Sequence, residues 1–119
     1  MRFKTEIREG VAVVRLSGRF VIGSDSDFLC VRKHLEETGT VKAIVDLREV
    51  PYIDSTGLAF VVDLHKALKA RGGKVMLTNA NPRVREVLAL TRICEVVPLA
   101  ADLDSAEAML RGQELAASC

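Results

Sequence analysis

Two adjacent hydroxyl residues directly follow a carboxylate at the point of the chain best suited to chemistry. Asp54, Ser55 and Thr56 lie between an apolar run at 41–47 and a segment of helical spacing at 56–70. They therefore belong to the start of a helix, where free backbone N–H groups and the helix dipole favour negative charge. A phosphoryl group on either hydroxyl adds about −1.5 to −2 charges there. The simpler alternative is that Ser55 only caps the helix.

Nucleophilic catalysis by Ser55 is not expected. A hydrolase elbow has a glycine two residues before its serine, where this chain has Ile53. The two histidines are His34 and His65, and His65 lies roughly 15 Å from Ser55 along a continuous helix. We expect His65 to pack partly in the core. The sequence predicts no catalytic residue, and the chain is not expected to be an enzyme.

Cofactor and metal chemistry finds little support in the sequence. A phosphate-binding loop of the Walker type is missing. Asp46, Glu49 and Asp54 are neighbours in sequence but lack a recognised metal spacing, so we predict no metal and no cofactor. Asp46 at a strand end leaves open a receiver-like phosphoacceptor, also conceivable at Asp54. A receiver-like site would need further acidic residues after the first strand to hold magnesium. At that position Glu9-Gly10 instead predicts a hairpin turn.

Composition indicates one small domain over residues 1–119, and 49% hydrophobic residues with 4% aromatics predict an aliphatic core. A net charge of +1 gives no reason to expect a nucleic-acid partner. No stretch approaches the roughly 20 apolar residues of a membrane span, and no signal peptide is recognisable, so membrane insertion is not expected. The three widely spaced cysteines (Cys30, Cys94 and Cys119) fit reduced thiols and a cytoplasmic location, with Cys30 and Cys94 expected in the core.

The pattern of apolar residues predicts an α/β fold: an initial β-hairpin, then alternating helices and strands. The expected product is a four- to five-stranded sheet with helices packed on it. Gly39 is placed to end the first helix, Asn81-Pro82 to begin the third, and Asp104 to cap the last. The hairpin is expected to extend to residue 17. Helices are expected at 24–38 and 56–70, and two more are expected to begin at 81 and at 104. Further strands are expected at 41–47, 75–78 and 96–99, and Pro98 is expected to end the strand at 96–99.

The central motif has a wider context that narrows its interpretation. Asp46-Leu47 ends the apolar strand, Val50, Tyr52 and Ile53 form a short link, and Asp54-Ser55-Thr56-Gly57-Leu58 follows. A Gly72-Gly73 pair then closes the helix before the strand Lys74–Leu77. This order of features resembles the STAS domain of bacterial anti-sigma-factor antagonists, over nearly the full length of the chain.

The resemblance implies a phosphorylation-controlled binding switch. The implied partner is an anti-sigma factor serine kinase with a histidine-kinase-like ATP fold, which binds the unphosphorylated domain and releases it after phosphorylating Ser55, or alternatively Thr56. A serine phosphatase would reset the switch. Asp54 would help to orient Ser55, and Gly57 would admit close approach of the partner.

One departure from the family pattern leaves a second function open. The family commonly has an acidic residue in the loop after the second strand, whereas Gly18–Ile22 contains none. A constitutive STAS scaffold subunit of a transport or signalling complex, with Ser55 never modified, is the alternative. We expect Phe20 or Ile22 of this loop to pack beside the motif, either in the core or facing the partner, and we expect Asp63 and Lys66 to contact the partner. A weak Asp63–Lys66 ion pair on a solvated helix face is the competing explanation.

Overall fold

The computed structural model describes residues 2–8, 10–18 and 25–110, with side chains from residue 29 onward in the first helix. Five strands form one sheet in chain order. The strands are β1 (Arg2–Arg8), β2 (Val11–Ser17), β3 (Lys42–Glu49), β4 (Lys74–Thr78) and β5 (Leu99–Ala100), and the helices are α1 (Asp25–Thr38), α2 (Ser55–Lys69), α3 (Pro82–Leu90), α4 (Ile93–Val96) and α5 (Leu103–Leu110). β1 and β2 are antiparallel, and the later strands add in parallel. The predicted α/β architecture is confirmed.

The C-terminal third differs from the prediction in two places. The edge strand expected at 96–99 is present but shifted, since β5 spans Leu99–Ala100. Before it comes the unpredicted one-turn helix α4, which follows Arg92 with its left-handed φ of 59° and ends at Val96. Pro98 precedes β5 rather than ending it, and its carbonyl accepts the Leu77 N–H at 2.9 Å. The cap of α5 is Asp102, whose carboxylate accepts the Ser105 N–H at 2.8 Å, and not Asp104 as expected.

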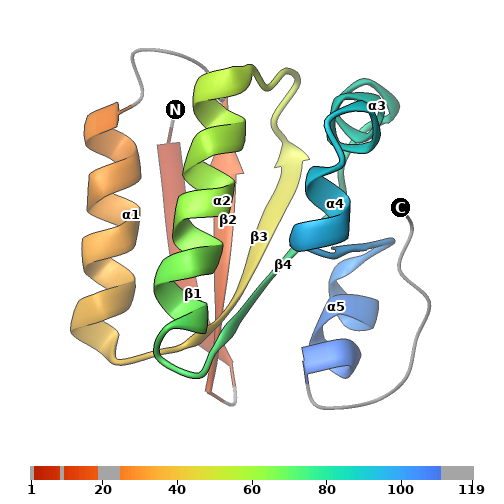
Figure 1. The fold of residues 1–119 in the computed structure, drawn as a ribbon. Helices are drawn as coiled ribbons and strands as arrows, with labels where there is room; N and C mark the ends of the chain where they lie inside the picture. Colours follow the sequence, from red (N-terminus) through yellow and green to blue (C-terminus); the bar gives the residue numbers. More distant parts are fainter. Residues whose placement is uncertain (1, 9, 19–24, 111–119) are drawn as a thin grey trace.

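The sheet separates two cores of different size. Alternate strand residues such as Val14, Val45 and Leu77 point toward α1 and α2, which lie side by side on the near face in Figure 1. On the opposite face, α5 packs over Ile44 and Met76 in a smaller cluster. β3 is apolar on both faces, as predicted for a covered central strand.

The larger core is aliphatic as expected, with Phe60 the one fully described aromatic side chain buried in it. Two expectations about cysteines are wrong. Cys30 is exposed on α1 instead of lying in the core. Cys94 packs half-buried against the core and is disulfide-bonded, so the reduced state expected for all three thiols does not hold for it.

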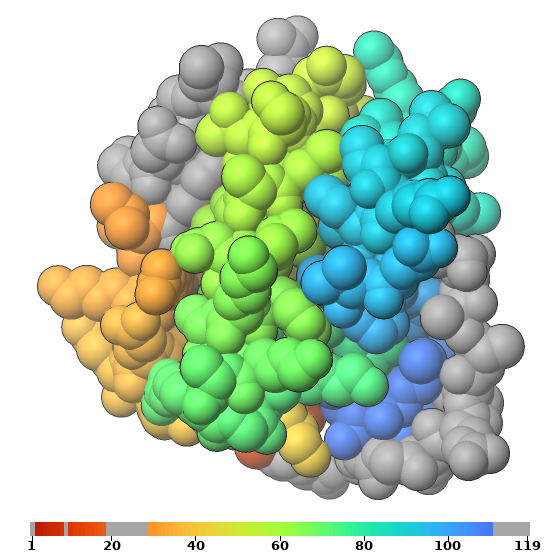
Figure 2. All heavy atoms as spheres, viewed as in Figure 1, coloured from red at the N-terminus to blue at the C-terminus, as the bar shows by residue number. Residues whose placement is uncertain are grey.

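The parallel strands place the start of three helices at one edge of the sheet. The carboxyl ends of β2, β3 and β4 point the same way, and α1, α2 and α3 begin at that edge (Figure 1). Figure 2 shows α2 running along the middle of the near face, between α1 and α4. The motif Asp54–Gly57 therefore lies at this edge, and Asp63 and Lys66 lie further along α2.

Candidate functional site

The loop between β3 and α2 is held firmly from both sides. Val50 and Ile53 are buried in the main core and anchor it from within. From α3, the Asn81 side-chain amide donates to the carbonyls of Val50 and Pro51 at 3.3 and 3.4 Å. The other end of the same amide accepts the Val84 N–H at 2.8 Å and caps α3. Asn81 therefore holds the loop before α2 in place and also caps α3.

Asp54, and not Ser55, caps α2. Its backbone is extended, with φ −114° and ψ −172°, and its carboxylate accepts the N–H groups of Thr56 and Gly57 at 2.9 and 3.2 Å. The alternative that Ser55 is merely the cap is therefore wrong. Ser55 is the first residue inside the helix and is exposed. A capping carboxylate keeps the helix start in place while the neighbouring hydroxyl faces solvent.

The rest of the motif turns inward. Thr56 is half-buried, and Gly57 and Leu58 are buried within the first turn. The Leu58 N–H donates to the Asp54 carbonyl at 3.0 Å and begins the regular helical pattern. Of the two hydroxyl residues, Ser55 is thus the one more accessible to another macromolecule.

Asp46 has a structural environment. Its nearly buried carboxylate accepts the Arg48 N–H at 3.0 Å and the Asn79 side-chain amide at 3.2 Å, and Arg15 lies 3.9 Å away. Asn79 has a left-handed φ of 58°, a conformation that Asn tolerates better than most residues. Asp46 ties the ends of β3 and β4 together, and among the described residues no cluster of acids accompanies it that could hold a metal. This arrangement does not support a receiver-like phosphoacceptor.

An exposed aromatic residue stands beside the motif. Tyr52 is 38% exposed, and the guanidinium of Arg83 lies 5.0 Å from the centre of its ring. This is within the range of a cation–π contact. Arg83 belongs to the first turn of α3. The contact therefore links the loop before Ser55 to α3 on the outer surface of the molecule.

The exposed side of α2 continues away from Ser55. Ala59 and Lys66 are exposed, and at 100° per residue both lie within about 40° of Ser55 around the helix axis. Asp63 faces α1, where its carboxylate accepts a hydrogen bond from Arg32 at 2.9 Å. The expected Asp63–Lys66 pair is therefore replaced by a pair between helices. Phe20 and Ile22, the other predicted contacts, lie outside the described residues.

His65 packs in the core side of α2, as expected, and does not approach Ser55. It is 8% exposed, and its Nδ1 has no hydrogen-bond partner in the structure. Burial lowers the pKa of His65, and the nearby cations Lys69 and Lys74 lower it further. Both effects favour the neutral form of the imidazole in the folded protein.

The sequence identified the motif but did not predict the long-range contacts that hold it in place. Asn81 was recognised as a helix cap, yet its second role joins residues 31 positions apart and leaves no local signal. The Tyr52–Arg83 contact and the Arg32–Asp63 pair are also long-range. In the part of the chain that the structure describes, no helix has the length and apolar character to cross a membrane.

Comparison with known proteins agrees with the geometry. The family model described as "STAS domain" matches residues 2–106. The anti-sigma F factor antagonist of Paenibacillus polymyxa is 23% identical over 105 residues, covering 83% of this chain and 86% of that protein. A STAS-domain containing protein of Pseudomonas aeruginosa is 30% identical over 78 residues, covering 66% of this chain and 76% of the other.

Solved structures show the same fold. The anti-sigma factor antagonist SpoIIAA in its unphosphorylated form superposes with a TM-score of 0.77, at 21% identity, over 96% of this chain and 100% of that one. The Bacillus protein SpoIIAA in its phosphorylated form gives a TM-score of 0.67 at 19% identity, over 91% and 99% of the two chains. With a family model covering most of its length and a matching fold, this chain belongs to the STAS domain family.

Proposed function

We propose that this protein is an anti-sigma factor antagonist whose binding is controlled by phosphorylation of Ser55. The observation that carries the proposal is the division of labour at the start of α2, where Asp54 caps the helix and Ser55 is exposed. The chain acts as a binding switch and not as an enzyme. The names of its relatives, and the existence of SpoIIAA in phosphorylated and unphosphorylated forms, support this role.

The partner we propose is an anti-sigma factor serine kinase with a histidine-kinase-like ATP fold, acting with a serine phosphatase in the cytoplasm. The kinase binds over Ser55 and the exposed strip of α2 that continues through Ala59 to Lys66. Asp63 lies at the margin of this surface because Arg32 already holds its carboxylate. Asp54 orients the first turn, and Thr56 is at most a secondary acceptor because it is half-buried.

The size of the effect that such a switch requires supports a position of Ser55 inside the interface. Shifting a complex from 99% bound to 1% bound needs about 5.5 kcal/mol of differential affinity. A charge at the rim of an interface mainly alters the association rate and its salt dependence. A phosphate at Ser55 meets the larger requirement if the partner surface accepts the neutral hydroxyl and leaves no room or hydration for a dianion.

Phosphorylation is tested with the kinase, Mg-ATP and mass spectrometry of the wild type, Ser55→Ala and Thr56→Val. One phosphate on Ser55 is expected, lost in Ser55→Ala and retained in Thr56→Val. Modification of Thr56 alone contradicts the assignment. Absence of transfer from every kinase that binds the domain favours the constitutive scaffold instead.

Binding is tested by calorimetry with Ser55→Asp and with Ala70→Asp as the matched control. Ala70 is exposed at the opposite end of α2, about 22 Å from Ser55 by helical rise, and receives the same charge. Ser55→Asp is expected to abolish binding, whereas Ser55→Ala and Ala70→Asp bind like wild type. Equal affinity of all four proteins would show that this edge is not the interface.

A further inference from the structure

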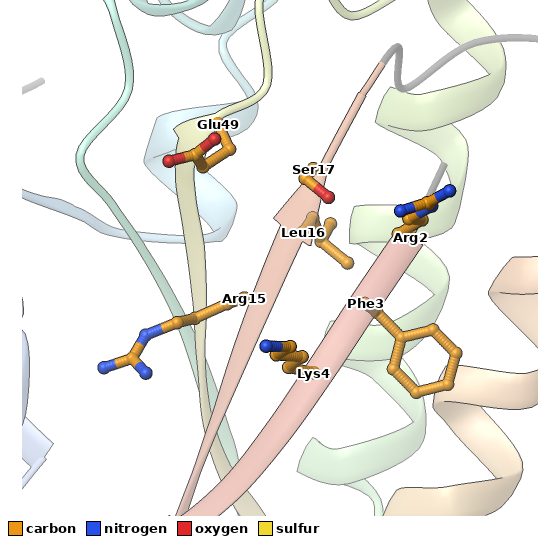
Figure 3. A pocket seen from close by; sticks show the side chains of 7 residues that line it. All are labelled: Arg2, Phe3, Lys4, Arg15, Leu16, Ser17 and Glu49. Carbon is orange, nitrogen blue, oxygen red and sulfur yellow. The ribbon is translucent and has the colours of Figure 1, made fainter.

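A concave site separate from the start of α2 lies on the face of the sheet opposite α1 and α2, over the strands that α5 does not cover. A cavity of about 650 Å³ extends over β1, β2 and the end of β3 (Figure 3). Pairing of Arg2 with Ser17 and of Lys4 with Arg15 puts these four side chains on one face. Figure 3 shows Lys4 and Arg15 on this side of the sheet, with the Phe3 ring directed toward the helices on the other side.

The side chains around this cavity carry excess positive charge. Arg2, Lys4 and Arg15 face one carboxylate, Glu49, which gives the lining a net charge of +2. Lys4 and Arg15 occupy directly opposed positions of an antiparallel pair, where like charges are destabilising. Ion pairs of Arg15 with Glu6 at 3.5 Å and with Asp46 at 3.9 Å offset this repulsion. Within the described chain, no carboxylate comes within ion-pairing distance of Arg2 or Lys4.

We propose that this cavity binds a small organic phosphate monoester. A dianion matches the net charge of the lining, a guanidinium presents paired donors to phosphate oxygens, and Lys4 adds a point charge. The hydroxyl of Ser17 is a further donor at the same end of the cavity. The volume lies within the range of small-molecule sites and is far larger than a phosphate alone, so an organic group fits beside it. Glu49 repels the anion and keeps its phosphate toward β1 and β2.

A solvated sheet face is the competing explanation, because lysine on an edge strand also discourages pairing with other chains. That explanation accounts for Lys4 alone. It does not account for Arg2, a second cation at the same hollow that no carboxylate among the described residues reaches. The two explanations differ in what they predict for a soluble phosphate, and the proposal is independent of Ser55 and of any kinase.

The probe is phenyl phosphate, with benzyl alcohol as the neutral comparison, added to the full-length protein and followed by amide NMR shifts and calorimetry. Shifts are expected at Lys4, Arg15 and Ser17 with phenyl phosphate only. Lys4→Gln is expected to weaken binding about tenfold, as removal of a charged hydrogen-bond donor does. Lys33→Gln, which removes an exposed lysine from α1, binds like wild type. Glu49→Gln binds more tightly, which cannot result from damaged folding.

The source of the phosphate is distinguished by a second experiment. Sedimentation with vesicles containing phosphatidic acid, compared with pure phosphatidylcholine, reports binding to a lipid headgroup. Binding of phenyl phosphate without sedimentation indicates a soluble ligand, and sedimentation that Lys4→Gln abolishes indicates a lipid. The proposal is overturned if neither probe binds, if Lys4→Gln and Lys33→Gln behave alike, or if the shifts lie at the start of α2.

Discussion

At the scale of single residues, the adjacent positions Asp54 and Ser55 have different roles. Asp54 satisfies two N–H groups that the helix start leaves free, and Ser55 contributes an exposed hydroxyl. Under the proposed function, stability and switching rest on different side chains. Substitutions at the two positions separate the two properties.

Asp54→Ala is expected to cost about 1 kcal/mol of unfolding free energy through loss of the cap, or roughly 3–5 °C in Tm for a domain of this size. Ser55→Ala is expected to leave Tm within about 1 °C, because the hydroxyl is not the cap. Thermal unfolding followed by circular dichroism measures both. A larger loss for Ser55→Ala than for Asp54→Ala contradicts the assignment of the cap.

His65 makes stability depend on pH. Burial and the cations Lys69 and Lys74 lower its pKa in the folded state, whereas the unfolded chain binds the proton near the ordinary value of about 6.5. The unfolded state therefore holds more protons below that pH, so this contribution is full above it and is lost as pH falls toward the folded pKa.

Urea unfolding of His65→Gln between pH 8 and 5 tests this linkage. The variant is expected to lose less stability on acidification than the wild type. His34→Gln, which changes an exposed histidine on α1, is the control and retains the wild-type slope. An unchanged slope in His65→Gln means that other groups cause the acid sensitivity.

At the scale of elements, the loop before α2 depends on α3. Asn81→Ser keeps a capping oxygen for α3 but loses the amide donor to the carbonyls of Val50 and Pro51. Hydrogen exchange at residues 52–57 is expected to accelerate in Asn81→Ser, while exchange within α3 stays near wild type. If α3 alone loses protection, the amide does not hold the loop.

The two glycines after α2 have different reasons to be glycine. Gly72 has a φ of 81° with open space around it, so Gly72→Ala is expected to cost about 1–2 kcal/mol of backbone strain. A Cβ on Gly73 would overlap the Val41 carbonyl oxygen, and that oxygen already accepts the Lys74 N–H. Gly73→Ala is expected to cost roughly 3 kcal/mol or more, as in severe overpacking. Chemical denaturation ranks the two, and the reverse order contradicts this account.

Periodicity predicted most elements because the long helices and strands bury whole faces, as β3 and α2 do. It missed α4, since four residues are too few to show a helical period. Residue type identified the cap of α3 correctly but did not identify the caps of α2 and α5. Asp54 and Ser55 are both good N-cap residues, and so are Asp102 and Asp104, so only the backbone angles decide between them. The supports from Asn81 and Arg83 join distant segments and have no signature in local sequence.

At the scale of the whole molecule, the two faces of the sheet differ in strength. Over its described residues, Leu103–Leu110, α5 buries three small or medium side chains against the sheet: Ala106, Ala108 and Leu110. α2 buries seven residues, and five of them belong to the larger core: Leu58, Phe60, Val61, Leu64 and Leu68. The face that carries Ser55 is therefore the more stable one, and the far face opens at lower free energy.

Hydrogen exchange of the intact chain tests this ranking. Amides of α5 are expected to exchange before those of α2, and Leu110→Ala is expected to accelerate α5 while leaving α2 almost unchanged. Leu68→Ala, which removes a buried side chain from α2, serves as the comparison and accelerates both helices. Equal effects of the two substitutions on α2 would mean that the molecule opens only as a unit.

The division between Asp54 and Ser55 also bears on how such a protein can change under selection. A residue that holds up the fold is constrained by stability, and most replacements there are purged. Position 55 carries almost none of that constraint, because the helix start is secured by its neighbour. A single replacement there can therefore remove or restore the hydroxyl without compensating mutations elsewhere. If Ser55 is phosphorylated as proposed, a duplicated copy of the domain can become a permanently bound or permanently released version of its ancestor in one step.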